Sequence, residues 1–262
     1  MTDWLALCRA SVEDVRGVLS DLPTRVEREP ILGIGLGGDE TTAIDEAAER
    51  AILARFRDTG ATIVSEEVGR LDGGATVVVI DPIDGSLNAK RGIPFFSLSI
   101  AVADGGAMDD VTFGYVYDFG SGEEWLARRG EGAWLNGEPL GGLRPKERIE
   151  ILAFEATRTS LIARHAPAFT ELAYRLRVMG SLALSLCHLA AGRVDGVCSL
   201  KEARSVDIAA AQLLCREVGI AVSLFDDPRP FGTAELDLAQ RSRIAAAGTS
   251  ELCRQVADAL SA

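Results

Sequence analysis

Two short runs of β-branched residues, 61–65 and 76–80, each lead into a group of acidic residues. The first run is followed by Glu66-Glu67 and the second by the segment 81–86, Asp-Pro-Ile-Asp-Gly-Ser. Such runs predict buried strands, so the carboxylates lie where a strand leaves the core and enters a loop. Carboxylates grouped there repel one another and lose hydration, and a bound cation relieves both penalties. The pattern therefore predicts a sheet whose strand ends form a metal site.

The chemistry of the 81–86 segment favours a hard divalent cation and a phosphate. Mg²⁺ takes oxygen ligands and keeps several waters, which suits grouped carboxylates. Pro82 fixes one φ angle and stiffens the link between Asp81 and Asp84. Gly85 permits a tight turn that leaves its own amide and that of Ser86 free to face an anion. Single Asp-Pro and Asp-Gly pairs usually belong to turns, but their combination with Glu66-Glu67 indicates a metal site.

The charge of the chain excludes several classes of partner. Its 262 residues include 39 acidic and 27 basic residues, for a net charge of -12. A protein this negative does not bind nucleic acid or an anionic membrane through its overall field. A phosphate ligand would therefore need a local positive device such as a metal ion. The hydrophobic fraction of 47% excludes wholesale disorder and is typical of a globular enzyme.

The sequence also bears on location. The most apolar stretch, 93–103, is interrupted by serines and is shorter than the roughly 20 residues that a membrane helix needs. The first residues lack the basic start and apolar run of a secretory signal. The 5 cysteines contain no Cys-x-x-Cys pair and are odd in number. Scattered, reduced thiols are typical of the cytoplasm, where we expect the chain to act.

The first half of the chain predicts an α+β unit. Apolar spacing indicates a helix over 3–20, with Thr2 available as its cap, and a second helix over 44–56 that stops at Gly60. A glycine-rich loop, 33–42, separates them and is expected to cover the metal site. Between 95 and 140, regularly spaced turns predict an antiparallel meander.

The second half predicts an α/β unit. Strands are expected at 149–154, 174–178, 194–199, 220–224 and 243–247, and helices at 181–191, 205–218 and 250–260. The polar stretch 141–148 is the best candidate for an internal boundary. We therefore predict an N-terminal half over 1–142 that carries most metal ligands. A C-terminal half over 143–262 would carry the last ligand and substrate contacts.

Several segments occur in the order seen in the inositol monophosphatase / fructose-1,6-bisphosphatase superfamily, which the chain resembles. They are 42–46 (Thr-Ala-Ile-Asp-Glu), 66–67, 81–86, 180–187 (Gly-Ser-Leu-Ala-Leu-Ser-Leu-Cys) and 206–210 (Val-Asp-Ile-Ala-Ala). The resemblance implies a layered αβαβα sandwich with the active site between its halves, and a homodimer. The compact form is most similar to the archaeal-type branch, whose members often hydrolyse both fructose 1,6-bisphosphate and inositol monophosphates.

The resemblance also implies roles for individual residues. Two or three Mg²⁺ ions, or Mn²⁺ as a substitute, would activate a water for in-line attack on the phosphate. The implied metal ligands are Glu66, Asp81, the Ile83 carbonyl, Asp84 and Asp207. The implied catalytic residues are Asp45 and the Ser86 hydroxyl, which orient the water, and Glu67, which acts through a water. The implied substrate contacts are Asp84, Gly85, Ser86, Arg177, Ser181, Lys201 and Arg204.

The chain departs from the family pattern at three positions. Ser86 stands where the family usually has Thr, and it keeps the hydroxyl. Val206 stands where many members carry Trp, which weakens the match to animal-type monophosphatases. Leu200 occupies the position at which archaeal-type members tend to carry an arginine for the distal phosphate of the sugar. Lys201, Arg204, Arg175 and Arg177 remain as candidate cations, so the choice between mono- and bisphosphates stays open.

Rival interpretations are an oxidoreductase, a non-enzymatic metal-binding module and a phosphatase with a different substrate. The segment 33–38 satisfies G-x-G-x-x-G, but it lacks the full preceding strand and the directly following helix of an NAD-binding fold. Asp45 and the hydroxyl at Ser86 are not needed merely to hold an ion, which favours an enzyme. Within phosphatases, 3′-phosphoadenosine 5′-phosphate and NADP are alternative substrates. We predict a phosphoric monoester hydrolase of carbohydrate metabolism, with a role in gluconeogenesis.

Overall fold

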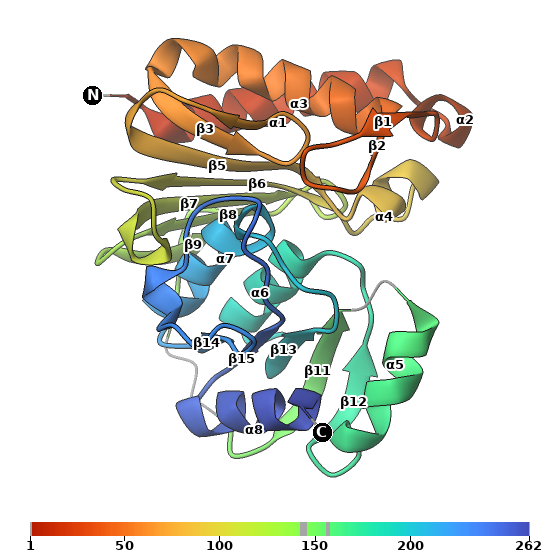
Figure 1. The fold of residues 1–262 in the computed structure, drawn as a ribbon, viewed down its shortest axis with the longest axis vertical. Helices are drawn as coiled ribbons and strands as arrows, with labels where there is room; N and C mark the ends of the chain where they lie inside the picture. The colour runs from red at the N-terminus through yellow and green to blue at the C-terminus, as the bar shows by residue number, and fades with distance from the viewer. Residues whose placement is uncertain (1, 142–145, 156–157, 262) are drawn as a thin grey trace.

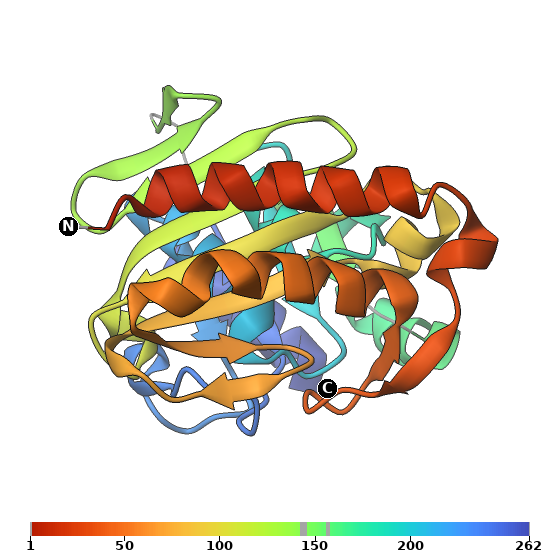
Figure 2. The same cartoon turned by 90° about the horizontal axis from the view of Figure 1, so that it is seen from above.

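The computed structural model describes residues 2–141, 146–155 and 158–261, and these form a layered αβαβα sandwich (Figure 1). The outer layer contains two helices, α1 (Trp4–Asp21) and α3 (Ala43–Phe56). Seen from above, both helices run across the first sheet (Figure 2). Each buries one apolar stripe, with Cys8, Val12 and Val15 on α1 and Ile44 and Ile52 on α3.

The first sheet has eight strands in the order β10-β9-β8-β7-β6-β5-β3-β4. Strands β6 to β10 form the antiparallel meander predicted between 95 and 140. Strand β5 pairs antiparallel with β6 and parallel with β3. Every residue of β6 is buried, because helices cover both faces of the sheet. The bounds are β3 (Ala61–Ser65), β4 (Gly69–Leu71), β5 (Gly74–Asp84), β6 (Ser97–Ala103), β7 (Val111–Asp118), β8 (Glu124–Arg128), β9 (Gly132–Leu135) and β10 (Glu138–Leu140).

Helices α6 (Leu182–Ala190) and α7 (Ser205–Glu217) form the central layer between the two sheets (Figure 1). Both are buried nearly all round, because they face a sheet on each side. The contact of α7 with β7 is close. A Cβ atom on Gly114 would lie 2.6 Å from the Ala210 carbonyl oxygen, so only glycine fits there.

The second sheet has five strands in the order β12-β11-β13-β15-β14. Strand β11 pairs in parallel with β12 and β13, whereas β15 pairs antiparallel with β13 and β14. Helix α8 (Ser250–Ser261) covers its outer face, and α5 (Thr159–His165) lies between β11 and β12 in the chain. The strand bounds are β11 (Ile149–Glu155), β12 (Ala173–Arg177), β13 (Gly196–Ser199), β14 (Ala221–Leu224) and β15 (Ile244–Ala247).

The structure confirms the expected fold class and corrects several local predictions. The cap of α1 is Asp3, which accepts a hydrogen bond from the Ala6 amide at 3.0 Å, and not Thr2. The expected loop at 33–42 is largely a hairpin of β1 (Ile31–Ile34) and β2 (Glu40–Thr42). The elements α2 (Arg25–Arg28), α4 (Ser86–Arg91), β4 and α5 were not predicted, because they are too short to show a clear hydrophobic period.

Further predictions concern the boundary between the halves, membrane-spanning helices and the cysteines. The boundary between 142 and 143 lies outside them, so the division into halves stays a prediction. No helix in the described ranges is long and apolar enough to cross a membrane. All 5 cysteines are buried and free.

Candidate active site

The predicted acidic residues meet in one cavity of about 250 Å³. It lies where β3 and β5 end, between the β1–β2 hairpin and the start of α7. Acidic side chains dominate its wall, and Lys201 and Arg204 are the only lysine or arginine side chains that line it within the described residues. The acidic lining residues are Asp39, Glu40, Asp45, Glu66, Glu67, Asp81, Asp84, Glu155, Glu202 and Asp207.

The loop that carries Glu66 and Glu67 is held by a buried carboxylate on α3. Glu49 Oε1 accepts hydrogen bonds from the amides of Glu67 at 3.0 Å and Val68 at 3.1 Å, and from the Ser65 hydroxyl. Our reading of the sequence missed Glu49. The available signal was its spacing from Asp45, which places both carboxylates on the same face of α3.

Asp81 and Asp84 are separated by an irregularity in the pairing of β5 with β6. Pro82 lies at this irregularity, where a residue without an N–H is tolerated in a sheet. Asp81 Oδ1 accepts the Ile83 amide at 3.0 Å. Asp84 Oδ2 accepts the Ala183 amide at 2.8 Å and the Ser181 hydroxyl, so the first turn of α6 holds this carboxylate.

Gly85 and Ser86 line the cavity directly after these acids. Gly85 has a φ of 91°, and a Cβ atom there would lie 3.0 Å from the Gly180 carbonyl oxygen. Both observations require glycine. The turn thus brings the two segments, 84–86 and 180–183, against each other.

Burial changes the protonation of the acidic cluster. It raises the pKa of Glu66 to about 7 and that of Asp84 to about 7. Burial, followed by the charges of Glu66 and Asp84, raises the pKa of Asp81 well above its ordinary value. Burial also raises the pKa of Asp45 and Glu67. The cluster therefore holds more negative charge than this environment supports without a cation.

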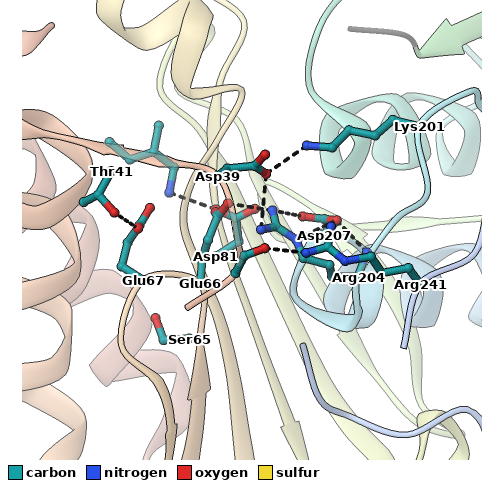
Figure 3. Close-up of polar contacts among 12 residues, drawn as sticks. Asp39, Thr41, Ser65, Glu66, Glu67, Asp81, Lys201, Arg204, Asp207 and Arg241 are labelled. Carbon is teal, nitrogen blue, oxygen red and sulfur yellow. Dashed lines mark hydrogen bonds and ion pairs between the residues drawn. The ribbon is translucent and has the colours of Figure 1, made fainter. Parts of the chain in front are cut away.

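Arg204 lies beside Glu66, Asp207 and Asp39, at one side of this cluster (Figure 3). Its Nη2 atom is 2.6 Å from Glu66 Oε1 and 2.8 Å from Asp207 Oδ1. Lys201 Nζ is 2.9 Å from Asp39 Oδ2, on the hairpin. Hydrogen bonds from the Leu36 and Gly37 amides to the Glu67 and Glu66 carbonyls, at 3.0 and 2.9 Å, hold the hairpin against the loop.

The donor set fits a divalent cation in its chemistry. Carboxylates of Glu66, Asp81, Asp84 and Asp207 line the cavity together with Ile83, and hard oxygen ligands are those that Mg²⁺ prefers. In the described ranges, however, no three Asp, Glu, His or Cys side chains are arranged to hold a metal ion. The Arg204 guanidinium lies between Glu66 and Asp207 instead.

The structure places most of the predicted site residues at the cavity. All five predicted metal ligands line it, as do Asp45, Glu67, Gly85, Ser86, Lys201 and Arg204. Ser181 lies behind Asp84 and donates to it. Arg177 is exposed on β12, does not line the cavity, and donates to the Leu176 carbonyl at 2.9 Å. The roles of these residues stay predictions.

The structure also shows where Leu200, one of the three departures from the family pattern, and the glycine motif at 33–38 lie. Leu200 is 5% exposed, belongs to the apolar core below the second sheet and does not line the cavity. Lys201, next to it, lines the cavity. The G-x-G-x-x-G segment at 33–38 belongs to the hairpin and opens no helix, unlike a dinucleotide-binding loop.

Comparisons with known proteins identify the family to which the chain is similar. The model of the inositol monophosphatase family matches residues 6–261. A fructose-1,6-bisphosphatase/inositol-1-monophosphatase of Archaeoglobus fulgidus is 34% identical over 94% of this chain and 93% of its own. The Nus factor SuhB of Escherichia coli is 36% identical over 85% of each chain. A crystal structure of an inositol monophosphatase-fructose 1,6-bisphosphatase superposes with a TM-score of 0.86 at 27% identity, covering 98% of this chain and all of the other.

The chain therefore belongs to the inositol monophosphatase family. This confirms the resemblance to archaeal-type members and excludes the oxidoreductase and the non-enzymatic module. It is a phosphatase that hydrolyses phosphomonoesters. Phosphatases of this family generally depend on a metal.

Proposed function

We propose that this phosphatase depends on Mg²⁺ and hydrolyses fructose 1,6-bisphosphate, inositol 1-phosphate or both. The observation that carries the proposal is the convergence of Glu66, Asp81, Asp84 and Asp207 on one cavity beside Gly85-Ser86. The names of the archaeal relatives at 33% and 34% identity support these substrates.

The metal would be held by the carboxylates of Glu66, Asp81, Asp84 and Asp207 and by the Ile83 carbonyl. We propose two or three Mg²⁺ ions, with Mn²⁺ as a possible substitute. Bound Mg²⁺ supplies charge neutralisation for the phosphoryl oxygens and lowers the pKa of water. The raised pKa values of Glu66 and Asp84 support this assignment, because they reflect carboxylates that gain from a nearby cation.

The protein groups around the metal ligands would position the reactants. Asp45 and the Ser86 hydroxyl orient the attacking water, and Glu67 contributes through a second water. Asp45 suits this task because its Oδ2 atom accepts the Thr42 amide at 3.1 Å, which fixes the carboxylate at the start of α3. The backbone amides of Gly85 and Ser86 bind the phosphate.

The body of the substrate would contact the second half of the chain. Lys201 and Arg204 are the proposed cations for a further anionic group, since both line the cavity. Ser181 contributes by holding Asp84. Arg177 remains a proposed contact only for a substrate that extends beyond the cavity wall.

A substrate panel tests the proposal. We would compare kcat/KM for fructose 1,6-bisphosphate, inositol 1-phosphate, 3′-phosphoadenosine 5′-phosphate and NADP with Mg²⁺ and with EDTA. We expect Mg²⁺-dependent phosphate release that is fastest from one of the first two compounds. Preference for either nucleotide, or equal rates with EDTA, would contradict the proposal.

We also propose a homodimer in the cytoplasm. Leu87, Ile93, Tyr174 and Val178 expose large apolar side chains, and Asn88 Nδ2 contacts the Met179 carbonyl at 2.8 Å, which joins their segments. Exposed apolar surface of this kind is typical of an interface. The free cysteines support a reducing compartment. Light scattering at micromolar concentration tests the dimer, and a monomer would contradict it.

A further inference from the structure

Arg204 is a buried cation whose ion-pair partners include two proposed metal ligands. Its side chain is 6% exposed, and it follows the strand β13 just before α7 begins. Nη2 contacts Glu66 Oε1 at 2.6 Å and Asp207 Oδ1 at 2.8 Å. The Arg204 amide donates to Asp207 Oδ2 at 2.7 Å, and Nε is 3.3 Å from the same oxygen. Both oxygens of Asp207 are therefore engaged by one residue.

The remaining guanidinium nitrogen is poorly satisfied. Nη1 is buried and has no hydrogen-bond partner in the part of the chain that the structure describes. Asp39 Oδ2 approaches it to 3.5 Å as an ion pair. A buried guanidinium normally satisfies its donors, because an unpaired one loses hydration without compensation. The position thus stabilises the carboxylates while leaving Arg204 itself incompletely bonded.

We propose that Arg204 is a resident counter-cation that competes with the divalent metal for Glu66 and Asp207. The inference rests on the proposed function, since it concerns the same metal site. A metal ion that takes Asp207 must replace contacts that Arg204 makes to both of its oxygens. A guanidinium charge beside the ion also opposes binding by Coulomb repulsion, which is stronger for a buried side chain such as Arg204. Once displaced, the guanidinium faces the cavity, where an anionic substrate can engage it.

The competition makes opposite predictions for the metal-free and metal-bound states. Without metal, Arg204 neutralises carboxylates that are otherwise buried beside one another, so its removal destabilises the protein. With metal, the same removal eliminates the competitor, so binding becomes tighter. A residue that merely oriented the ligands would produce the reverse effect on metal affinity, because its loss would disorder them.

The test is Arg204→Gln, studied by calorimetric titration with MgCl₂ in the absence of substrate. We expect the Mg²⁺ Kd to fall about tenfold, the scale on which groups that contact metal ligands alter metal affinity. In EDTA the Tm of the variant should lie below that of the wild type. Saturating Mg²⁺ should raise its Tm by more than it raises that of the wild type.

Arg241→Gln is the matched control. Arg241 is exposed, donates to the Gly37 carbonyl near the same cavity, and makes no contact with Glu66 or Asp207. The Arg241→Gln substitution removes the same charge near the same cavity. The Mg²⁺ Kd of this variant should therefore change less than about twofold. Should Arg204→Gln fail to fold, Arg204→Lys keeps the charge but loses the planar fork. It should then also bind Mg²⁺ more tightly than the wild type.

The outcomes separate the inference from the function on which it rests. An unchanged or weaker Mg²⁺ affinity in the Arg204 variants, with normal binding by the wild type, would overturn the competition alone. An absence of Mg²⁺ binding by the wild type would overturn the proposed metal site itself. A tighter Kd in the variants with an unchanged control supports the competition.

Discussion

Individual carboxylates in this molecule differ in how they are held, and the differences indicate their tasks. Asp45 is 6% exposed and accepts the Thr42 amide and hydroxyl at the start of α3. Asp207 lies in the first turn of α7, and its oxygens accept hydrogen bonds from the amide and the guanidinium of Arg204. Hydroxyl and amide donors thus hold the Asp45 carboxylate, whereas a guanidinium contacts that of Asp207. This contrast allows their proposed roles to be separated by substitution.

Asp45→Asn should slow hydrolysis while leaving metal binding largely intact. Asparagine keeps the shape and one oxygen for the Thr42 amide, but it removes the charge that we propose orients the water. We expect kcat to fall by at least about 100-fold, which is typical for loss of a positioned acid–base group. The Mg²⁺ Kd should stay within about threefold of the wild-type value.

Asp207→Asn should instead weaken Mg²⁺ binding as well as turnover. Near-wild-type turnover in either variant would contradict the proposed roles of Asp45 and Asp207.

The raised pKa values of Glu66 and Asp84, both about 7, predict how stability depends on pH. These acids bind protons more tightly in the folded metal-free protein than in the unfolded chain. Stability in EDTA should therefore fall as the pH rises from about 6 to 8, as both groups ionise. Mg²⁺ competes with protons for the same oxygens, so it should raise the Tm more at pH 8 than at pH 6. Thermal unfolding at the two pH values measures both, and a Tm in EDTA that rises with pH would contradict the prediction.

At the scale of secondary structure elements, β11 and α6 together hold the carboxylate of Asp84, a proposed metal ligand. Glu155, at the end of β11, is 7% exposed and accepts the Gly180 amide at 2.8 Å and the Ser185 hydroxyl at 2.6 Å. This fixes the segment whose Ser181 caps α6 and donates to Asp84. The second sheet therefore orients a carboxylate that belongs to the first.

Ser181→Ala should lower Mg²⁺ affinity. The change removes one hydrogen bond that orients Asp84 and weakens the cap of α6. Groups that orient metal ligands typically contribute about 10–100-fold to metal affinity or activity. Activity as a function of Mg²⁺ concentration measures the effect. Ser11→Ala is the matched control, since Ser11 is equally buried but donates to the Leu7 carbonyl at 3.0 Å within α1. An equal shift in both variants would show a general effect on folding instead.

The close contact between α7 and β7 at Gly114 can be tested by substitution. A methyl group on Gly114 would lie 2.6 Å from the Ala210 carbonyl, so Gly114→Ala must push α7 away from β7. We expect a loss of about 1–3 kcal/mol in the free energy of unfolding, measured with urea. Gly17→Ala, on α1, meets nothing within 4 Å and should be neutral or stabilising by up to about 1 kcal/mol. Equal stability of the two variants would contradict the close packing.

For the whole molecule, the layered arrangement brings the site together. Helix α7 packs on the first sheet and carries Asp207 to the ends of β3 and β5, while its other side contacts the second sheet. The hairpin adds Asp39, which contacts Lys201 across the cavity. Neither half of the chain contains a complete cavity wall, because the lining residues come from both.

The main helices and strands were predictable from local periodicity, because each buries a face with a clear period. The same pattern predicted Glu66, Asp81, Asp84 and Asp207 at the ends of elements. The sequence also indicated the family, which the comparisons confirm. Three relations follow from the packing of the layers and were not predictable: Arg204 bridges Glu66 and Asp207, Glu49 and Glu155 hold the loops, and Arg177 lies outside the cavity. These relations join residues far apart in the chain, and local periodicity carries no information about which distant side chains meet once the layers pack.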